Sequence, residues 1–134
     1  MHNEWKFGKM KPSQIAAREN LLLNYKIWLS SITGDGLLEG STWELLRAIK
    51  KEDSISKAAK ITGISYRKAW GDLKSAEELL GYALVTKKRG GLDGGCTTLT
   101  EKAIKLLEAY AALQSKLDKT VEKAFEDFKV NIKQ

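Results

Sequence analysis

The segment over residues 54–81, SISKAAKITGISYRKAWGDLKSAEELLG, constrains the fold more than any other part of the chain. A short helix is expected to begin near Ser56 and to end at Gly63, because glycine readily adopts the left-handed conformation that closes a helix. The side chains expected to turn inward here are Ala58, Ala59 and Ile61, followed by Ile64 in the turn. The pattern therefore predicts a short helix and a tight turn.

Ser65 is expected to cap a second, longer helix that ends at Gly81. Its apolar residues are separated by four, three and four positions, which is the spacing of one buried helix face. They are Ala69, Leu73, Ala76 and Leu80. The whole segment therefore predicts a helix–turn–helix, with the small Ala59 where the two helices would cross.

Three elements are predicted before this motif. Residues 13–23 suit a short helix, and alternating apolar and polar side chains over residues 25–29 predict a strand. Ser41 and Glu44 have the spacing of a capping box, so a helix is expected over about residues 42–51. Its inward side chains would be Leu45, Leu46 and Ile49.

A β-hairpin is predicted after the second helix. Residues 83–89 suit one strand with Leu84 facing inward, and residues 96–100 suit the returning strand. The connecting GGLDGG at 90–95 is not a phosphate-binding loop, because it lacks the GK[ST] ending. The expected fold is mainly α with a small β wing, a winged helix–turn–helix.

Thr100 is expected to cap a long helix that runs to about residue 129. Its apolar side chains repeat at nearly heptad spacing, which is typical of a helix that pairs with another helix. They are Leu106, Tyr110, Leu113, Leu117, Val121, Ala124 and Phe128. A homodimer is therefore expected, and the alternative is that this seam packs on its own domain. The chain would then comprise a lead segment (1–24), a winged helix–turn–helix domain (25–100) and a C-terminal dimerisation helix (101–134).

Positive charge collects in the middle of the chain. Residues 54–100 carry 8 basic and 4 acidic side chains, a net charge of +4, whereas residues 1–53 (8 against 7) and 101–134 (7 against 6) each have a net charge of +1. A basic region attracts polyanions, because each phosphate contact releases condensed counterions. Alone this is weak support for nucleic-acid binding, since many proteins are mildly basic.

Enzymatic chemistry is disfavoured by the shortage of cysteine and histidine. Cys96 is the only cysteine and His2 the only histidine, so no disulfide within the chain and no convincing Cys–His or multi-His site can form. No catalytic residue, metal or cofactor is expected. No apolar run approaches the ~20 residues of a membrane span, and the N-terminus lacks a secretory pattern, so a cytoplasmic protein is expected.

The outward face of the second helix is expected to enter the major groove of double-stranded DNA. Arg67 suits a bidentate base contact, Lys74 suits a phosphate, and Gly71 would allow a close approach. Free NH groups at the start of the first helix favour a phosphate, and the wing suits backbone or minor-groove contact. The predicted DNA-binding residues are Ser54, Ser56, Lys57, Ser65, Tyr66, Arg67, Trp70, Gly71, Lys74, Lys87, Lys88 and Arg89.

These residues also have plainer interpretations. Lys68 and Lys74 suit a merely solvated face, and packing is the favoured interpretation of Trp70. Residues 87–89 suit a hairpin edge kept soluble by its charges, and Cys96 suits a small filler. The alternative function is a winged-helix protein-interaction module without specific DNA binding.

Residues 42–113 resemble the N-terminal DNA-binding domain of the molybdate-responsive ModE regulators. The matching stretches are LLRAIKKEDSISKAAKITGISYRKAWGDL at 45–73 and LLGYALVTKKRGGLDGGCTTLT at 79–100. The most specific part is Ser65-Tyr66-Arg67 followed by Ala69-Trp70, whereas the SISxAA opening is shared more widely with the LysR-type winged helix.

This resemblance implies a homodimeric transcription regulator on a palindromic operator. It also implies that the SYR…AW motif belongs to the recognition helix and that Arg89 to Gly95 form the wing. The chain departs from the family's pattern at Leu92 and Asp93 in the wing tip. It ends at residue 134, before any C-terminal molybdate-binding domain, so a stand-alone form is expected and molybdate is not expected to bind this chain directly.

Overall fold

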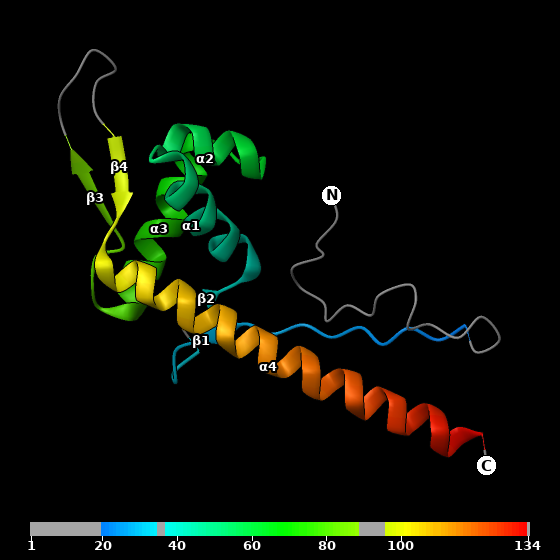
Figure 1. The fold of residues 1–134 in the computed structure, drawn as a ribbon. Helices are drawn as coiled ribbons and strands as arrows, with labels where there is room; N and C mark the ends of the chain where they lie inside the picture. The colour runs from blue at the N-terminus through cyan, green and yellow to red at the C-terminus, as the bar shows by residue number, and fades with distance from the viewer. Residues whose placement is uncertain (1–19, 35–36, 89–95, 134) are drawn as a thin grey trace. The chain divides into compact units, whose positions relative to one another are not determined.

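The structure is a computed structural model that describes residues 20–34, 37–88 and 96–133. It divides into two units, one of residues 28–109 and one of residues 1–27 with 110–134. The elements are β1 (Leu29–Ser30), β2 (Leu37–Leu38), α1 (Gly40–Glu52), α2 (Ile55–Thr62), α3 (Tyr66–Leu80), β3 (Val85–Lys88), β4 (Cys96–Leu99) and α4 (Glu101–Ile132) (Figure 1). The predicted winged helix–turn–helix followed by a long helix is confirmed.

The core of the unit 28–109 forms around α1, as expected. Trp43, Leu45, Leu46 and Ile49 are fully buried on this helix, and α3 adds Ala69, Leu73 and Ala76. Leu38 and Leu84 close the core from the two hairpins. Burying each of the large side chains among them contributes about 1.5–3 kcal/mol, so the buried face holds α3 firmly in the unit.

The helix–turn–helix is closed by the caps that the sequence predicts. Gly63 ends α2 with a φ of 76°, and Gly81 ends α3 with a φ of 83°. The Ser65 hydroxyl accepts a hydrogen bond of 3.0 Å from the Lys68 backbone N–H. The expectation for Ile61 is wrong: it is 60% exposed, because Ile55, Ala58 and Ala59 supply the buried face of this short helix.

The capping box predicted at Ser41 is also wrong. Helix α1 begins at Gly40, so Ser41 already lies inside the helix, and Glu39 occupies the N-cap position without a side-chain cap. The Glu39 carbonyl accepts instead from the backbone N–H groups of Thr42 and Trp43, at 3.0 and 3.3 Å. The helix itself is confirmed, with bounds wider by a residue or two than the predicted 42–51.

The strand predicted at residues 25–29 is largely wrong. Residues 20–28 form no regular element, and β1 contains only Leu29 and Ser30, paired antiparallel with β2. Strand β2 also contains only two residues, so it offers no backbone partner with which residues 25–28 could pair. Residues 13–19 of the predicted first helix lie outside the described part of the chain, and residues 20–23 are not helical.

The second hairpin is confirmed over β3 and β4. The strands pair antiparallel, with Val85 opposite Leu99 and Lys88 opposite Cys96. The Thr97 backbone N–H donates to the carbonyl of Asp53, at 3.1 Å, which attaches β4 to the end of α1. Residues 89–95, which include Arg89 and the GGLDGG segment, lie outside the described residues.

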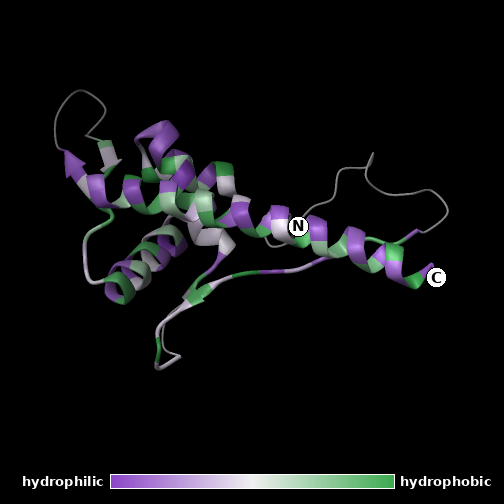
Figure 2. Cartoon of the chain, turned by 60° about the horizontal axis from the view of Figure 1, so that its bottom comes forward, coloured by the Kyte–Doolittle hydropathy of each residue, from purple (hydrophilic) through white to green (hydrophobic). Residues whose placement is uncertain are grey.

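The long helix α4 begins as predicted. The Thr100 hydroxyl accepts from the Ala103 backbone N–H, at 3.1 Å, and donates to the Ala83 carbonyl, at 2.9 Å. Hydrophobic and hydrophilic residues alternate along the helix, as Figure 2 shows. Within the described ranges, this helix and the others are too short or too polar to cross a membrane.

Hydrogen bonds join residues 20–27 to α4 inside the smaller unit. The Tyr25 hydroxyl donates to Asp118, whose Oδ1 also accepts from Gln114 Nε2 at 3.0 Å. Burial and the Asp118 carboxylate raise the pKa of Tyr25 above its ordinary value, because both disfavour the phenolate. Tyr25, expected in a strand, therefore acts as a side-chain anchor.

Candidate nucleic-acid interface

Helix α3 presents three different surfaces, which follow from its 3.6-residue period. One is buried in the core. A second, outward surface contains Arg67, Gly71 and Lys74, separated by four and three positions and all exposed. A third contains Tyr66, Trp70 and Glu77, at spacings of four and seven, and lies beside the second hairpin.

The outward surface is chemically suited to DNA. Arg67 offers a planar guanidinium near the N-terminal end of the helix, and Lys74 lies seven residues further on, about 10 Å along the axis. Gly71 lies between them, and a Cβ added there would meet no atom of the described residues within 4 Å. The protein's own packing therefore does not require glycine at this position, although glycine is about 1 kcal/mol less favourable than alanine in a helix.

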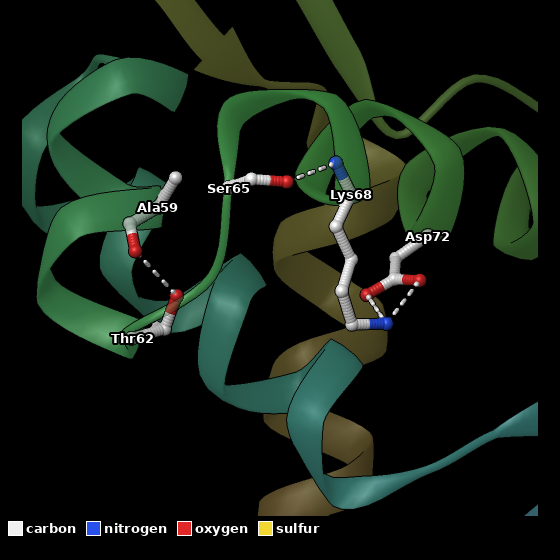
Figure 3. Close-up of polar contacts among 5 residues, drawn as sticks. All are labelled: Ala59, Thr62, Ser65, Lys68 and Asp72. Carbon is white, nitrogen blue, oxygen red and sulfur yellow. Dashed lines mark hydrogen bonds and ion pairs between the residues drawn. The ribbon is translucent and has the colours of Figure 1, made fainter.

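Lys68 lies on a different side of α3 from these residues. Its Nζ lies 3.3 Å from both Oδ1 and Oδ2 of Asp72, one helical turn away (Figure 3). Figure 3 also shows the Ser65 cap and the bond from the Thr62 hydroxyl to the Ala59 carbonyl, which together fix the turn between the two helices. The ion pair neutralises the charge of Lys68 locally, whereas Arg67 and Lys74 form no ion pair with other described residues, so Lys68 is chemically distinct from them.

The surface of α3 beside the hairpin is aromatic. The rings of Tyr66 and Trp70 meet edge to face, with centroids 6.3 Å apart and planes at 78°. The Nζ atom of Lys87, on β3, lies 4.6 Å from the centroid of the Trp70 ring. Trp70 is half-buried and Tyr66 is 53% exposed. Both side chains therefore contact the protein and are also partly accessible to solvent.

The start of α2 provides backbone donors. The helix begins at Ile55, one residue earlier than expected, and Ser54 is its N-cap. The Ser54 hydroxyl accepts from the Lys57 backbone N–H at 3.1 Å, so this oxygen acts as the helix cap. The side chains of Ser56 and Lys57 are exposed beside it.

The wing carries two exposed lysines among its described residues, Lys87 and Lys88. They are consecutive on β3, so their side chains leave opposite faces of the hairpin. Figure 2 shows the hydrophilic end of this strand. Only Lys87 is directed to Trp70, so two residues that look equivalent in the sequence have different surroundings.

The sequence pattern does not identify Glu77, which positions the hairpin. The Glu77 carboxylate accepts a 2.8 Å hydrogen bond from the Leu84 backbone N–H, which joins the end of α3 to the start of the hairpin. An acidic residue one turn before a helix end carries no sequence signal that distinguishes this function from ordinary solvation. Its partner is a backbone group, which no residue pattern reveals.

The residues predicted to form the dimer seam on α4 have mixed exposure in the single chain. Tyr110 is 7% exposed, and its hydroxyl donates to Gln114 Oε1 at 3.4 Å. Leu106, Leu117 and Val121 are half-buried, whereas Leu113 and Phe128 are 40% and 50% exposed. Ala103, Leu107 and Phe125 are buried on the same helix, although the predicted seam omits them.

In the described ranges, no three His, Cys, Asp or Glu side chains come together as a metal site would require. Cys96, interpreted from the sequence as a small filler, is exposed at the start of β4 and so does not fill the core.

A trihelical helix–turn–helix with an adjacent β wing and a cationic, exposed recognition surface defines the class of DNA-binding regulatory domains. Residues 41–110 match the family described as bacterial regulatory helix-turn-helix protein, lysR family, and the chain belongs to this family. The match covers α1, the helix–turn–helix, the wing and the start of α4.

Within the family, the domain is ModE-like. It is 39% identical over 83 residues to the molybdenum transport protein ModE of Azotobacter vinelandii, a match that covers 59% of this chain and 31% of that protein. It is 37% identical over 81 residues to the transcriptional regulator ModE of Haemophilus influenzae, covering 60% and 30% respectively. The DNA-binding transcriptional dual regulator ModE of Escherichia coli K12 is 38% identical over 69 residues, covering 52% and 26%. The matched part therefore spans less than a third of each relative's length.

Among solved structures, ArgP from Mycobacterium tuberculosis is similar with a TM-score of 0.46 and 21% sequence identity. The similarity covers 68% of this chain and 31% of that one.

Proposed function

We propose that this protein is a transcription regulator that binds a specific sequence of double-stranded DNA as a homodimer. The observation that carries the proposal is the outward surface of α3, where Arg67, Gly71 and Lys74 are exposed on the second helix of a LysR-family helix–turn–helix. Its ModE-like relatives include proteins named as transcriptional regulators, which is a non-enzymatic class.

The outward residues of α3 are proposed to make different kinds of DNA contact. Arg67 lies near the N-terminal end of the helix, the part that contacts base edges in this motif, and a guanidinium matches O6 and N7 of guanine. Lys74, two turns further along, contacts a phosphate. Gly71 lets the helix backbone approach the groove.

The start of α2 and the wing hold the DNA backbone. The exposed Lys57 and the free NH groups of the first turn of α2 favour a phosphate, because the positive end of the helix dipole is there. Lys88 contributes a further phosphate contact from β3. These contacts fix orientation and supply most of the salt dependence.

The homodimer is proposed to form through α4. Leu113 and Phe128 of the predicted seam are substantially exposed in the single chain, as are Val130 and Ile132 near the end of the helix. A second copy would remove this apolar surface from water. Two-fold symmetry then requires an inverted repeat, with half-sites about 34 Å apart along the DNA.

The test is selection of bound duplexes from a random pool, followed by anisotropy titration at several salt concentrations. The expected result is an inverted repeat bound at least 10³-fold more tightly than random duplex. Binding that falls with salt but yields no motif would contradict sequence specificity. No binding even at low salt would favour the protein-interaction module.

The dimer is tested separately by Leu113→Glu, with Ser115→Glu as the matched control. Both positions are exposed on α4, and both variants introduce the same charge. Leu113→Glu should halve the mass measured by light scattering and weaken binding to the inverted repeat, whereas Ser115→Glu should do neither. Equal behaviour of the two variants would exclude Leu113 from the interface.

The proposal includes no molybdate site in this chain. Similarity to the ModE proteins is confined to less than a third of their length, the part that carries the helix–turn–helix. The matched helix–turn–helix region is proposed to bind DNA without molybdate, and the same titration with and without added molybdate measures this. Action on chromosomal DNA agrees with the cytoplasmic location expected from the sequence.

A further inference from the structure

Helix α3 and the wing are joined at two points of one surface. Near the first turn of α3, the Lys87 ammonium lies 4.6 Å from the centre of the Trp70 ring. Near the last turn, the Glu77 carboxylate holds the Leu84 backbone N–H at 2.8 Å. The two contacts come from residues seven positions apart on α3 and three apart on the hairpin, so they fix both the place and the direction of β3.

The contact between Lys87 and Trp70 is a cation–π interaction. The ammonium lies within the ~6 Å over which the face of an indole ring attracts a cation. Trp70 in turn contacts Tyr66 edge to face, with the ring centroids 6.3 Å apart. The three side chains therefore form a continuous bridge from β3 to the N-terminal end of α3, the end nearest Arg67.

We propose that Lys87 is a positioning residue that sets the wing against the recognition helix through Trp70, and that Lys88 is the wing lysine that contacts phosphate. This inference rests on the proposed DNA binding. Lys87 and Lys88, which look equivalent in the sequence, then have different functions. Trp70 both positions the wing and forms part of the proposed DNA-binding surface. Specificity then depends on Lys87, because helix and wing must meet the DNA in a fixed register.

The first experiment needs no DNA. Amide hydrogen exchange of β3 and β4 is compared in Lys87→Met, Trp70→Leu and the matched control Lys88→Met, which removes the same charge one residue along the strand. Lys87→Met and Trp70→Leu should speed exchange about two- to five-fold, the equivalent of one exposed cation–π contact. Lys88→Met should leave it unchanged, and Lys87→Arg should restore protection, because guanidinium also stacks on indole.

The second experiment is a double-mutant cycle on the selected duplex and on random duplex. The Lys87→Met and Trp70→Leu variants should be coupled by about two- to five-fold in the ratio of specific to random affinity, whereas Lys88→Met and Trp70→Leu should be additive. Lys88→Met should reduce the slope of log affinity against log salt by about 0.9.

The outcomes separate this inference from the proposed function. If the wild type binds no duplex, the proposed function fails, and the exchange data alone decide whether Lys87 positions the wing. Unchanged exchange in Lys87→Met would overturn the inference. So would additive effects of Lys87 and Trp70 on the specificity ratio, which would make Lys87 an ordinary phosphate contact like Lys88.

Discussion

Replacement of Arg67 by alanine tests the recognition surface most directly. Arg67 is exposed, and no hydrogen bond or ion pair joins its side chain to the residues that the structure describes. Its loss should therefore change the free energy of unfolding by less than about 0.5 kcal/mol, the usual range for surface positions. Any larger effect on DNA binding then comes from the interface itself.

The expected loss follows from the geometry of a bidentate contact. A guanidinium paired with a guanine edge contributes about 1–3 kcal/mol of discrimination, and 1.4 kcal/mol corresponds to a tenfold change in affinity. Arg67→Ala should therefore weaken the selected duplex by about 5- to 150-fold. Random duplex should be affected far less, because its binding depends on charge and not on base edges.

Anisotropy titrations on the selected duplex and on each of its single-base variants provide the measurement, with thermal unfolding as the check on stability. Lys68→Ala is the matched control, since it removes the next positive charge on the same helix. Lys68 is paired with Asp72 at 3.3 Å on another side of α3. The Lys68→Ala variant should therefore keep the base preferences of the wild type.

Two results would refute this reasoning. One is an Arg67→Ala variant that keeps both its affinity and its preference at every base position. The other is a Lys68→Ala variant that relaxes one base position as strongly as Arg67→Ala does. The second result would place a different side of α3 against the DNA.

The remaining predictions address other parts of the chain. Lys74→Ala should weaken all duplexes alike and reduce the salt slope by about 0.9, whereas a change confined to one base position would contradict a phosphate contact. Gly63→Ala should lower the free energy of unfolding by about 1 kcal/mol in thermal melts, because φ is 76° there. Gly71→Ala should raise the free energy of unfolding by a similar amount in the same melts, yet weaken specific binding in the anisotropy titration. Tyr25→Phe should cost about 1 kcal/mol at neutral pH by removing the bond to Asp118. Because the folded-state pKa of Tyr25 is raised above 10.0, this contribution is complete below pH 10 and is lost as the pH rises further, so denaturant unfolding of the variant should be less sensitive to alkali.

The sequence predicts the helix–turn–helix well because its signals are local. Gly63, Ser65 and Gly81 act through their own backbone conformation or through a partner three residues away, so a linear pattern contains the whole interaction. The buried alanines and Leu73 follow for the same reason, since helical spacing alone selects them.

The sequence predictions fail where residues distant in the sequence determine the local structure. The start of α1 is determined by Glu39, next to the short β2 strand, and not by the serine that matches a capping motif. Tyr25 is held by Asp118, which lies 93 positions away, so alternation in the local sequence cannot predict its conformation. The partners of Glu77 and Trp70 likewise depend on where the hairpin lies, which is a tertiary property.

The attachment of the hairpin also bears on how this domain can diversify. Among the described residues, hydrogen bonds attach its base, from Leu84 to Glu77 and from Thr100 to Ala83, and another joins Thr97, which lies opposite Lys87, to Asp53. The contact of Lys87 with Trp70 is a further attachment. None of them requires a particular number of residues between Lys88 and Cys96. Doubling a loop's length adds only about 0.6 kcal/mol of closure entropy. Insertions or exchanges of that connection are therefore expected to leave the attachment of the hairpin to α1 and α3 intact, so its length and composition can change, by selection or by design, without disturbing the helix–turn–helix.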